Sequence, residues 1–68
     1  MELSARNQLR GKVTSVKRGT VVAEVSIQIE GGQTIVSTIS LSSVDRLKLK
    51  EGDAVTAFIK ASEVIVGK

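Results

Sequence analysis

Apolar and polar residues alternate along most of the chain, a pattern that is typical of half-buried β-strands. The clearest case is 21–29, where every odd position is apolar and most even positions are polar. A weaker alternation predicts a strand over 8–16, and a run of β-branched residues predicts another over 34–41. Turns are expected between these strands, at 17–19 and at 30–33, where two consecutive glycines suit the positive φ of a tight hairpin.

The alternation ends near 41, and a short helix is expected next. Ser42 is predicted as the N-cap, with Asp45 three residues later in a variant of the capping box. Val44 and Leu47 then follow at helical spacing. The sequence therefore predicts one helix over about 43–47.

Two further strands are predicted in the C-terminal part, over 54–60 and 63–66, with an interruption at Ala61 and Ser62. Three strands, a short helix and two strands follow the order of the OB-fold, a small five-stranded barrel with its helix between strands three and four. We therefore expect an all-β, OB-fold-like barrel formed by a single domain over 1–68. Another small barrel or an open sheet is the alternative.

The composition of the chain limits its chemistry and its stability. The 68 residues include no Cys, His, Trp, Tyr or Pro. A domain of this size has marginal stability and usually needs disulfides, a metal or further subunits. Without Cys, disulfides are excluded, and without Cys and His a structural zinc site is disfavoured. We therefore expect further subunits to stabilise the domain, in a homo-oligomer. The same absences favour a binding protein over an enzyme, with a Ser–Lys pair as the remaining catalytic alternative.

The apolar stretches are far too short to span a membrane, and no apolar signal region stands at the N-terminus. A cytoplasmic location is therefore expected. The 10 Lys and Arg residues against 7 Asp and Glu residues give a net charge of +3, which favours an anionic ligand.

Nucleic acid is one anion that an OB-fold-like barrel could bind. Single-strand binders, however, stack bases on aromatic side chains, and Phe58 is the one aromatic residue here. Phe58 falls on the strand face opposite Val55 and Ile59, and we expect it to pack at a subunit interface. A nucleic-acid-binding module and a purely structural assembly domain remain the alternatives to a protein that binds a small anion.

Three breaks in the pattern gather the groups that a small oxyanion needs, namely cations, hydroxyls and backbone N–H groups. They are 4–7 (Ser-Ala-Arg-Asn), 40–43 (Ser-Leu-Ser-Ser) and 60–62 (Lys-Ala-Ser). Each one alone is also explained by turn formation, helix capping or a solvated charge. Together, in a chain with almost no aromatic residues, they favour a compact anion over a polymer.

The two ends of the chain carry motifs that resemble those of the Mop domain. Residues 4–13 read SARNQLRGKV, which is similar to the Mop opening S-A-R-N-x-L-x-G-x-V. Residues 59–64 read IKASEV, which is similar to its closing I-K-A-S-x-V, and 23–25, 40–44 and 49–52 resemble its second strand, helix and turn. A stand-alone Mop domain of this length is similar to the molbindins. The resemblance implies an OB-like fold, a homohexamer built as a trimer of dimers, and storage of molybdate in the cytoplasm.

The resemblance also implies where molybdate binds. Its motifs place the anion at a subunit interface against Ser4, Ala5, Arg6, Lys60 and Ala61, with Ser40 and Ser43 supplied by a neighbouring subunit. Ala61 stands where some relatives carry Ser, so its backbone N–H would have to serve. A second oxyanion site is expected at Gly19 and Thr20, where a turn should expose backbone N–H groups.

The charge of the anion predicts the selectivity of such a site. Molybdate at neutral pH is a dianion without protons, so it suits a site that only donates hydrogen bonds. Phosphate keeps a proton that needs an acceptor, and leaving this proton unpaired costs roughly 1–3 kcal/mol. We therefore expect tungstate, which has nearly the size and charge of molybdate, to compete for the site, and phosphate not to compete.

Overall fold

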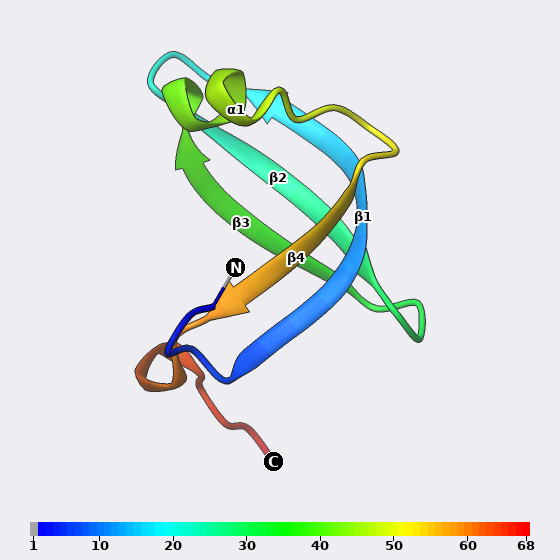
Figure 1. Ribbon diagram of the computed structural model, residues 1–68, viewed down its shortest axis with the longest axis vertical. Helices are drawn as coiled ribbons and strands as arrows, with labels where there is room; N and C mark the ends of the chain where they lie inside the picture. The colour runs from blue at the N-terminus through cyan, green and yellow to red at the C-terminus, as the bar shows by residue number, and fades with distance from the viewer. Residues whose placement is uncertain (1) are drawn as a thin grey trace.

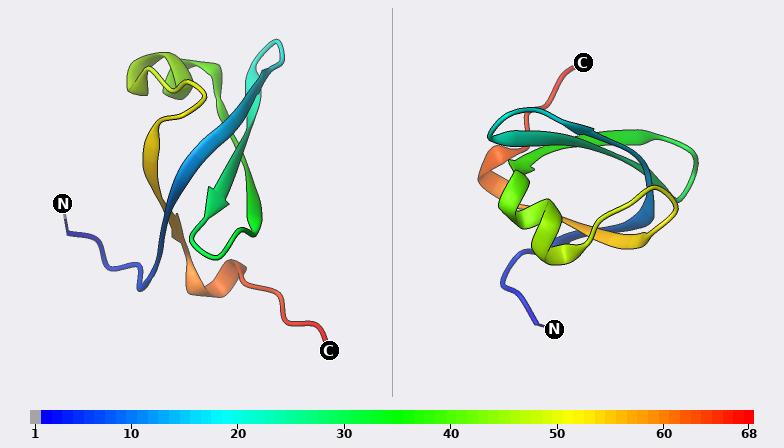
Figure 2. Two further views of the ribbon diagram at one scale, coloured as in Figure 1. Left: turned by 90° about the vertical axis from the view of Figure 1, so that its right-hand side faces the viewer. Right: turned by 90° about the horizontal axis from the view of Figure 1, so that it is seen from above.

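The computed structural model describes residues 2–68 and consists of one antiparallel sheet that curls on itself, with a short helix at one end (Figure 1). The elements are β1 (Asn7–Arg18), β2 (Val22–Ile29), β3 (Thr34–Ser40), α1 (Leu41–Leu47), β4 (Ala54–Ile59) and the 3-10 turn η1 (Ala61–Glu63). The strands pair in the order β3-β2-β1-β4, so β3 and β4 are the two edges. Seen from above, the sheet curls into most of a ring (Figure 2), which makes it an OB-like half-barrel.

The long strand β1 connects the two sides of the half-barrel. Its first half pairs with β4 and its second half with β2, and both partners pair with β1 at Gly11 and Lys12. A Cβ atom at Gly11 would collide with the backbone carbonyl of Gln28 in β2. Glycine is therefore required at this point, because the backbones of the two strands approach too closely for a side chain.

A β-bulge divides β1 into two halves of opposite phase. The register against β2 shifts between Val13 and Ser15, which adds one residue to β1. Val13 before the bulge and Val16 after it both pack into the core, although one is odd and the other even. The bulge thus explains why the alternation over 8–16 is weaker than that over 21–29.

The core lies inside the curl and consists of small aliphatic side chains. The buried residues are Val13, Ala23, Val25, Ile27 and Val44. Those from β2 occupy odd positions, as the alternation predicted, and Val44 anchors α1 to the barrel. The all-β class and the position of the helix between the third and fourth strands are confirmed.

The predicted start of the helix is wrong by two residues. Helix α1 begins at Leu41, and its N-cap is Ser40 rather than Ser42, because the Ser43 N–H donates to the Ser40 side chain. Ser40 ends β3 with an extended backbone, which is the conformation an N-cap requires, whereas Ser42 already lies inside the helix.

The predicted fifth strand is also absent from the structure of the single chain. Residues 61–63 form η1, and 64–66 pair with no strand in the described part of the chain. The physical reason is the direction of the chain, because η1 leads the C-terminal residues away from the sheet (Figures 1 and 2). Within residues 2–68 the half-barrel therefore has four strands, and none of them lies between β3 and β4.

Candidate functional site

A pocket of about 450 Å³ lies where β1 begins and β4 ends, and two segments from opposite ends of the sequence form it. Its lining is Ser4, Ala5, Arg6, Lys60, Ala61 and Ser62. The N-terminal segment and η1 lie next to each other at this end of the barrel (Figure 1). The five residues that the resemblance assigned to one subunit are thus brought together within one chain.

Strand pairing positions the two segments of this pocket. Asn7 and Ile59 form the terminal residue pair of the ladder between β1 and β4. The Asn7 side chain strengthens that pair, because its Nδ2 donates to the Ile59 carbonyl at 3.1 Å. Gln8 Nε2 donates to the Ala5 carbonyl at 2.8 Å and so ties the N-terminal segment to the start of β1. Arg6 and Lys60 each lie one residue outside the Asn7–Ile59 pair, which places them at the same end of the sheet.

The pocket is positively charged and lacks a competing carboxylate. Arg6 and Lys60 are its charged residues, and none of the described residues that line it is Asp or Glu. Between 2 and 68, the ion pairs are Arg10–Glu30, Arg18–Asp45 and Lys50–Asp53. Since neither Arg6 nor Lys60 belongs to these pairs, both cations are available to an external anion.

The turn η1 adds backbone donors to the pocket. The N–H groups of Glu63 and Val64 donate back to the carbonyls of Lys60 and Ala61, at 2.9 and 3.3 Å. Ala61 and Ser62 are the first residues of this turn, so their N–H groups have no partner within it. Ser62 was part of the donor-rich segment 60–62, but the resemblance assigned it no contact, and its place in the pocket comes from the structure.

Ser40, the N-cap of α1, and Ser43, within α1, do not line the pocket. Helix α1 lies at the opposite end of the barrel from the N-terminal segment and η1 (Figure 1). The hydroxyl oxygens of Ser40 and Ser43 are 2.9 Å apart and hydrogen-bonded, and Ser40 Oγ also accepts from the Ser43 N–H at 3.1 Å. Ser42 Oγ joins them at 3.1 Å from Ser40 Oγ. A contribution of these serines to a neighbouring subunit's site stays a prediction.

The turn at Gly19 and Thr20 lies at this same end. The Gly19 N–H donates to the Val22 carbonyl at 2.8 Å, so this group is consumed inside the turn. In the single chain the hairpin closes through the Gly19 N–H, whereas Thr20 is exposed. A second oxyanion site at Gly19 and Thr20 stays a prediction.

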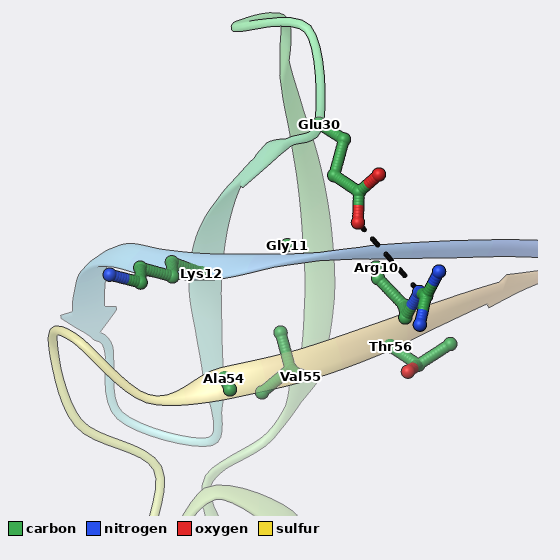
Figure 3. A pocket seen from close by; sticks show the side chains of 7 residues that line it. All are labelled: Arg10, Gly11, Lys12, Glu30, Ala54, Val55 and Thr56. Atoms are coloured by element: carbon green, nitrogen blue, oxygen red, sulfur yellow. Dashed lines mark ion pairs between the residues drawn. The ribbon is translucent and has the colours of Figure 1, made fainter.

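Another pocket of about 450 Å³, which the sequence did not suggest, lies on the outer face of β1 and β4. It includes Arg10, Lys12 and Thr56, but also the Glu30 carboxylate, which is 3.7 Å from Arg10 Nε. Figure 3 shows Arg10 directed toward Glu30 and Lys12 pointing away from both. The carboxylate makes this pocket less suited to a dianion than the pocket between 4–6 and 60–62.

The described part of the chain holds no cluster of three or more His, Cys, Asp or Glu residues that could chelate a metal ion. No helix within residues 2–68 has the length and apolar character needed to cross a membrane.

Comparison with known proteins gives consistent results. Residues 3–66 match the model of the family described as the TOBE domain. Molybdenum-pterin-binding protein 3 of Clostridium pasteurianum is 52% identical over 66 residues, covering 97% of this chain and 97% of that protein. The structure of MopII from Clostridium pasteurianum has a TM-score of 0.94 at 49% identity and covers 98% of this chain and 100% of its own. The cytoplasmic molybdate-binding protein ModG with molybdate bound has a TM-score of 0.92 at 45% identity, covering 96% of this chain and 46% of that one.

Proposed function

Because the chain belongs to the TOBE domain family, and because its pocket presents two unpaired cations, we propose that this protein binds molybdate as the oxyanion. The observation that carries the proposal is that Arg6 and Lys60 line the same pocket, and that none of its described lining residues is Asp or Glu. The relatives named for molybdenum-pterin binding and for molybdate binding support the identity of the anion.

The roles of the pocket residues follow from their chemistry. Arg6 presents a planar fork of N–H donors to two oxygens of the anion, whereas Lys60 acts as a point charge. Ser4 contributes a hydroxyl, and Ala5 and Ala61 contribute backbone at the pocket wall. A ligand with four acceptor oxygens and no proton satisfies these groups without any acceptor from the protein.

We further propose that the site is completed at an interface within a homohexamer that stores molybdate in the cytoplasm. Few residues of the single chain are buried, which leaves a large part of the apolar surface for contact with other subunits. Ser40 and Ser43 of a neighbouring subunit would supply further hydroxyls to the pocket. A second anion would bind near Gly19 and Thr20, and tungstate would replace molybdate at both sites.

Isothermal titration of the purified protein with molybdate, tungstate, sulfate and phosphate tests this function. We expect molybdate and tungstate to bind with similar affinity, and phosphate to bind at least about 10-fold more weakly because its proton finds no acceptor. Phosphate binding as tight as molybdate would refute the donor-only site. Elemental analysis of the native protein provides an independent check, since bound molybdenum supports the proposal and co-purified nucleic acid supports the alternative of a nucleic-acid-binding module.

A further inference from the structure

The half-buried side chain of Asn7 crosses between the two strands whose ends form the pocket. Its Nδ2 donates to the Ile59 carbonyl at 3.1 Å, and the two residues are 52 positions apart in the sequence. Asn7 belongs to the donor-rich segment 4–7, yet it does not line the pocket. Its amide is hydrogen-bonded to the neighbouring strand, so any effect of this side chain on a bound anion is indirect.

This hydrogen bond fixes the backbone beside both cations of the pocket. The Ile59 carbonyl belongs to the peptide unit that continues into Lys60. Because a peptide unit is planar, a bond to its oxygen also orients the Lys60 N–H. On the other strand, Arg6 is the residue directly before Asn7. One side-chain amide therefore connects the backbone next to Arg6 with the backbone next to Lys60.

The same end of the sheet brings two like charges together. One position beyond the Asn7–Ile59 pair, the antiparallel register sets Arg6 opposite Lys60. Like charges in opposing positions of a sheet are destabilising, and neither cation has an ion pair within residues 2–68. Without an anion between them, their repulsion favours separation of the two strand ends. The hydrogen bond from Asn7 to Ile59 opposes that separation.

We propose that Asn7 is a positioning residue, which keeps Arg6 and Lys60 side by side in the absence of the anion. A site that is already held in its binding geometry loses less conformational freedom when the ligand binds, so the same contacts give a higher affinity. The inference rests on the proposed function, because it concerns the same anion site. It adds that the affinity of this site depends on a side chain outside the pocket lining.

Isothermal titration of two Asn7 variants with molybdate tests this role. Asn7→Leu replaces the amide by an apolar group of similar size, and Asn7→Ala removes it. Each should raise the Kd about 3- to 10-fold, as expected for the loss of one hydrogen bond. Gln28→Leu is the matched control, because Gln28 Nε2 also donates to a backbone carbonyl, that of Gly32 at 3.4 Å, but lies outside the pocket lining. The control should change the Kd less than about 2-fold. A wild-type Kd in both Asn7 variants would overturn the proposal.

A double-mutant cycle separates positioning of the cations from a general loss of stability. If Asn7 acts by holding the two cations together, its removal should matter less once one cation is gone. Asn7→Leu in a Lys60→Ala background should therefore raise the Kd less than about 2-fold further. An equal factor in both backgrounds would mean that Asn7 acts through the fold as a whole, and it would overturn the positioning role.

A measurement without any anion distinguishes this inference from the proposed function. In Asn7→Leu, amide hydrogen exchange should be at least about 5-fold faster at the end of the β1–β4 ladder, at Gln8, Phe58 and Ile59, and unchanged in the β2–β3 ladder. Unchanged exchange at the β1–β4 end would refute the inference whatever the protein binds. Faster exchange there, in a protein whose wild type binds no molybdate, would leave Asn7 holding the two strand ends and would count against the proposed function alone.

Discussion

The two ends of the barrel contain similar residues but organise them differently. At the pocket end, formed by 4–6 and 60–62, the cations and the first N–H groups of η1 have no partner inside the pocket lining. At the helix end, formed by the Gly19–Thr20 turn and 40–43, the Ser40 hydroxyl, the Ser43 N–H and the Gly19 N–H all bond to groups of the same end. The hydrogen-bond donors of the pocket end are available to a ligand, whereas those of the helix end stabilise the fold.

The difference shows why a cluster of donors is not by itself an anion site. A ligand at the pocket end gains hydrogen bonds without breaking any, because Arg6 and Lys60 make no ion pair within residues 2–68. A ligand at the helix end has to compete with the cap that begins α1, and breaking that cap costs roughly 0.5–2 kcal/mol. We therefore expect the pocket end to be the primary site, and the helix end to contribute only the donors that its internal hydrogen bonds leave available.

The largest expected effect comes from removing a cation at the pocket end. Arg6→Ala should weaken molybdate binding by about 1.5–3 kcal/mol, or roughly 10- to 150-fold in Kd, because a charge-assisted contact is lost. The thermal midpoint without ligand should hardly change, since Arg6 is exposed and lies outside the strands. Isothermal titration and thermal unfolding of the same samples measure both quantities.

Arg10→Ala is the matched control for this variant. Arg10 is also an exposed arginine of the N-terminal region, but it faces Glu30 on the outer face of the sheet (Figure 3). Its removal should leave the Kd within about 2-fold of the wild-type value. If Arg10→Ala weakened binding as strongly as Arg6→Ala, the effect would come from net charge and the pocket would lose its assignment.

The next effect in size is expected at the helix end and concerns stability. Ser40→Ala removes the N-cap of α1 and should lower the free energy of unfolding by about 1 kcal/mol in urea at a fixed protein concentration. Ser42→Ala should lower it by less than about 0.5 kcal/mol, because Ser42 lies within the helix and does not cap it. Equal losses in the two variants would contradict the placement of the cap at Ser40.

The sequence predicted the elements of the barrel well and its closure poorly. The alternation in β2 identified the buried positions directly, because one face of that strand packs against the core and the other faces solvent. The bulge in β1 weakened the same signal, since it shifts the phase of the apolar positions between Val13 and Val16. Residues 64–66 are β-branched and favour a strand, but η1 directs them away from the edges of their own sheet, and local propensity does not report whether an edge is within reach.

The candidate site was predicted in a similar, uneven way. The end motifs named Arg6 and Lys60, and the pairing of Asn7 with Ile59 explains why residues so distant in sequence meet. The hydrogen bonds at Ser40 and Gly19 could not be predicted from the residues alone, because they depend on where β3 ends and on how the hairpin closes. The serines of 40–43 have hydroxyl and N–H groups that could bind an anion, yet those of Ser40 and Ser43 already form the hydrogen bonds that cap α1.

A smaller effect is expected from the ion pair that connects β1 to the helix end. Arg18 Nη2 lies 3.0 Å from Asp45 Oδ1, and both side chains are about half exposed. Asp45→Asn should therefore lower the free energy of unfolding by only about 0.2–1 kcal/mol, and the loss should shrink as salt is added. Glu30→Gln, which removes the looser pair with Arg10, should have a smaller effect. A loss that does not depend on salt would show that Asp45 acts through something other than this pair.

The smallest expected effect has the opposite sign and also lies at the helix end. Lys48 ends α1 in the left-handed conformation, with φ 52° and ψ 43°, which an L-residue adopts only at a cost. Lys48→Gly should relieve that strain and raise the free energy of unfolding by about 0.5 kcal/mol, reduced by the greater freedom of glycine in the unfolded chain. Arg46→Gly, two residues earlier in the regular helix, should instead destabilise the protein by about 1 kcal/mol. Urea unfolding of both variants gives opposite shifts if the backbone at Lys48 is strained, and shifts of the same sign if it is not.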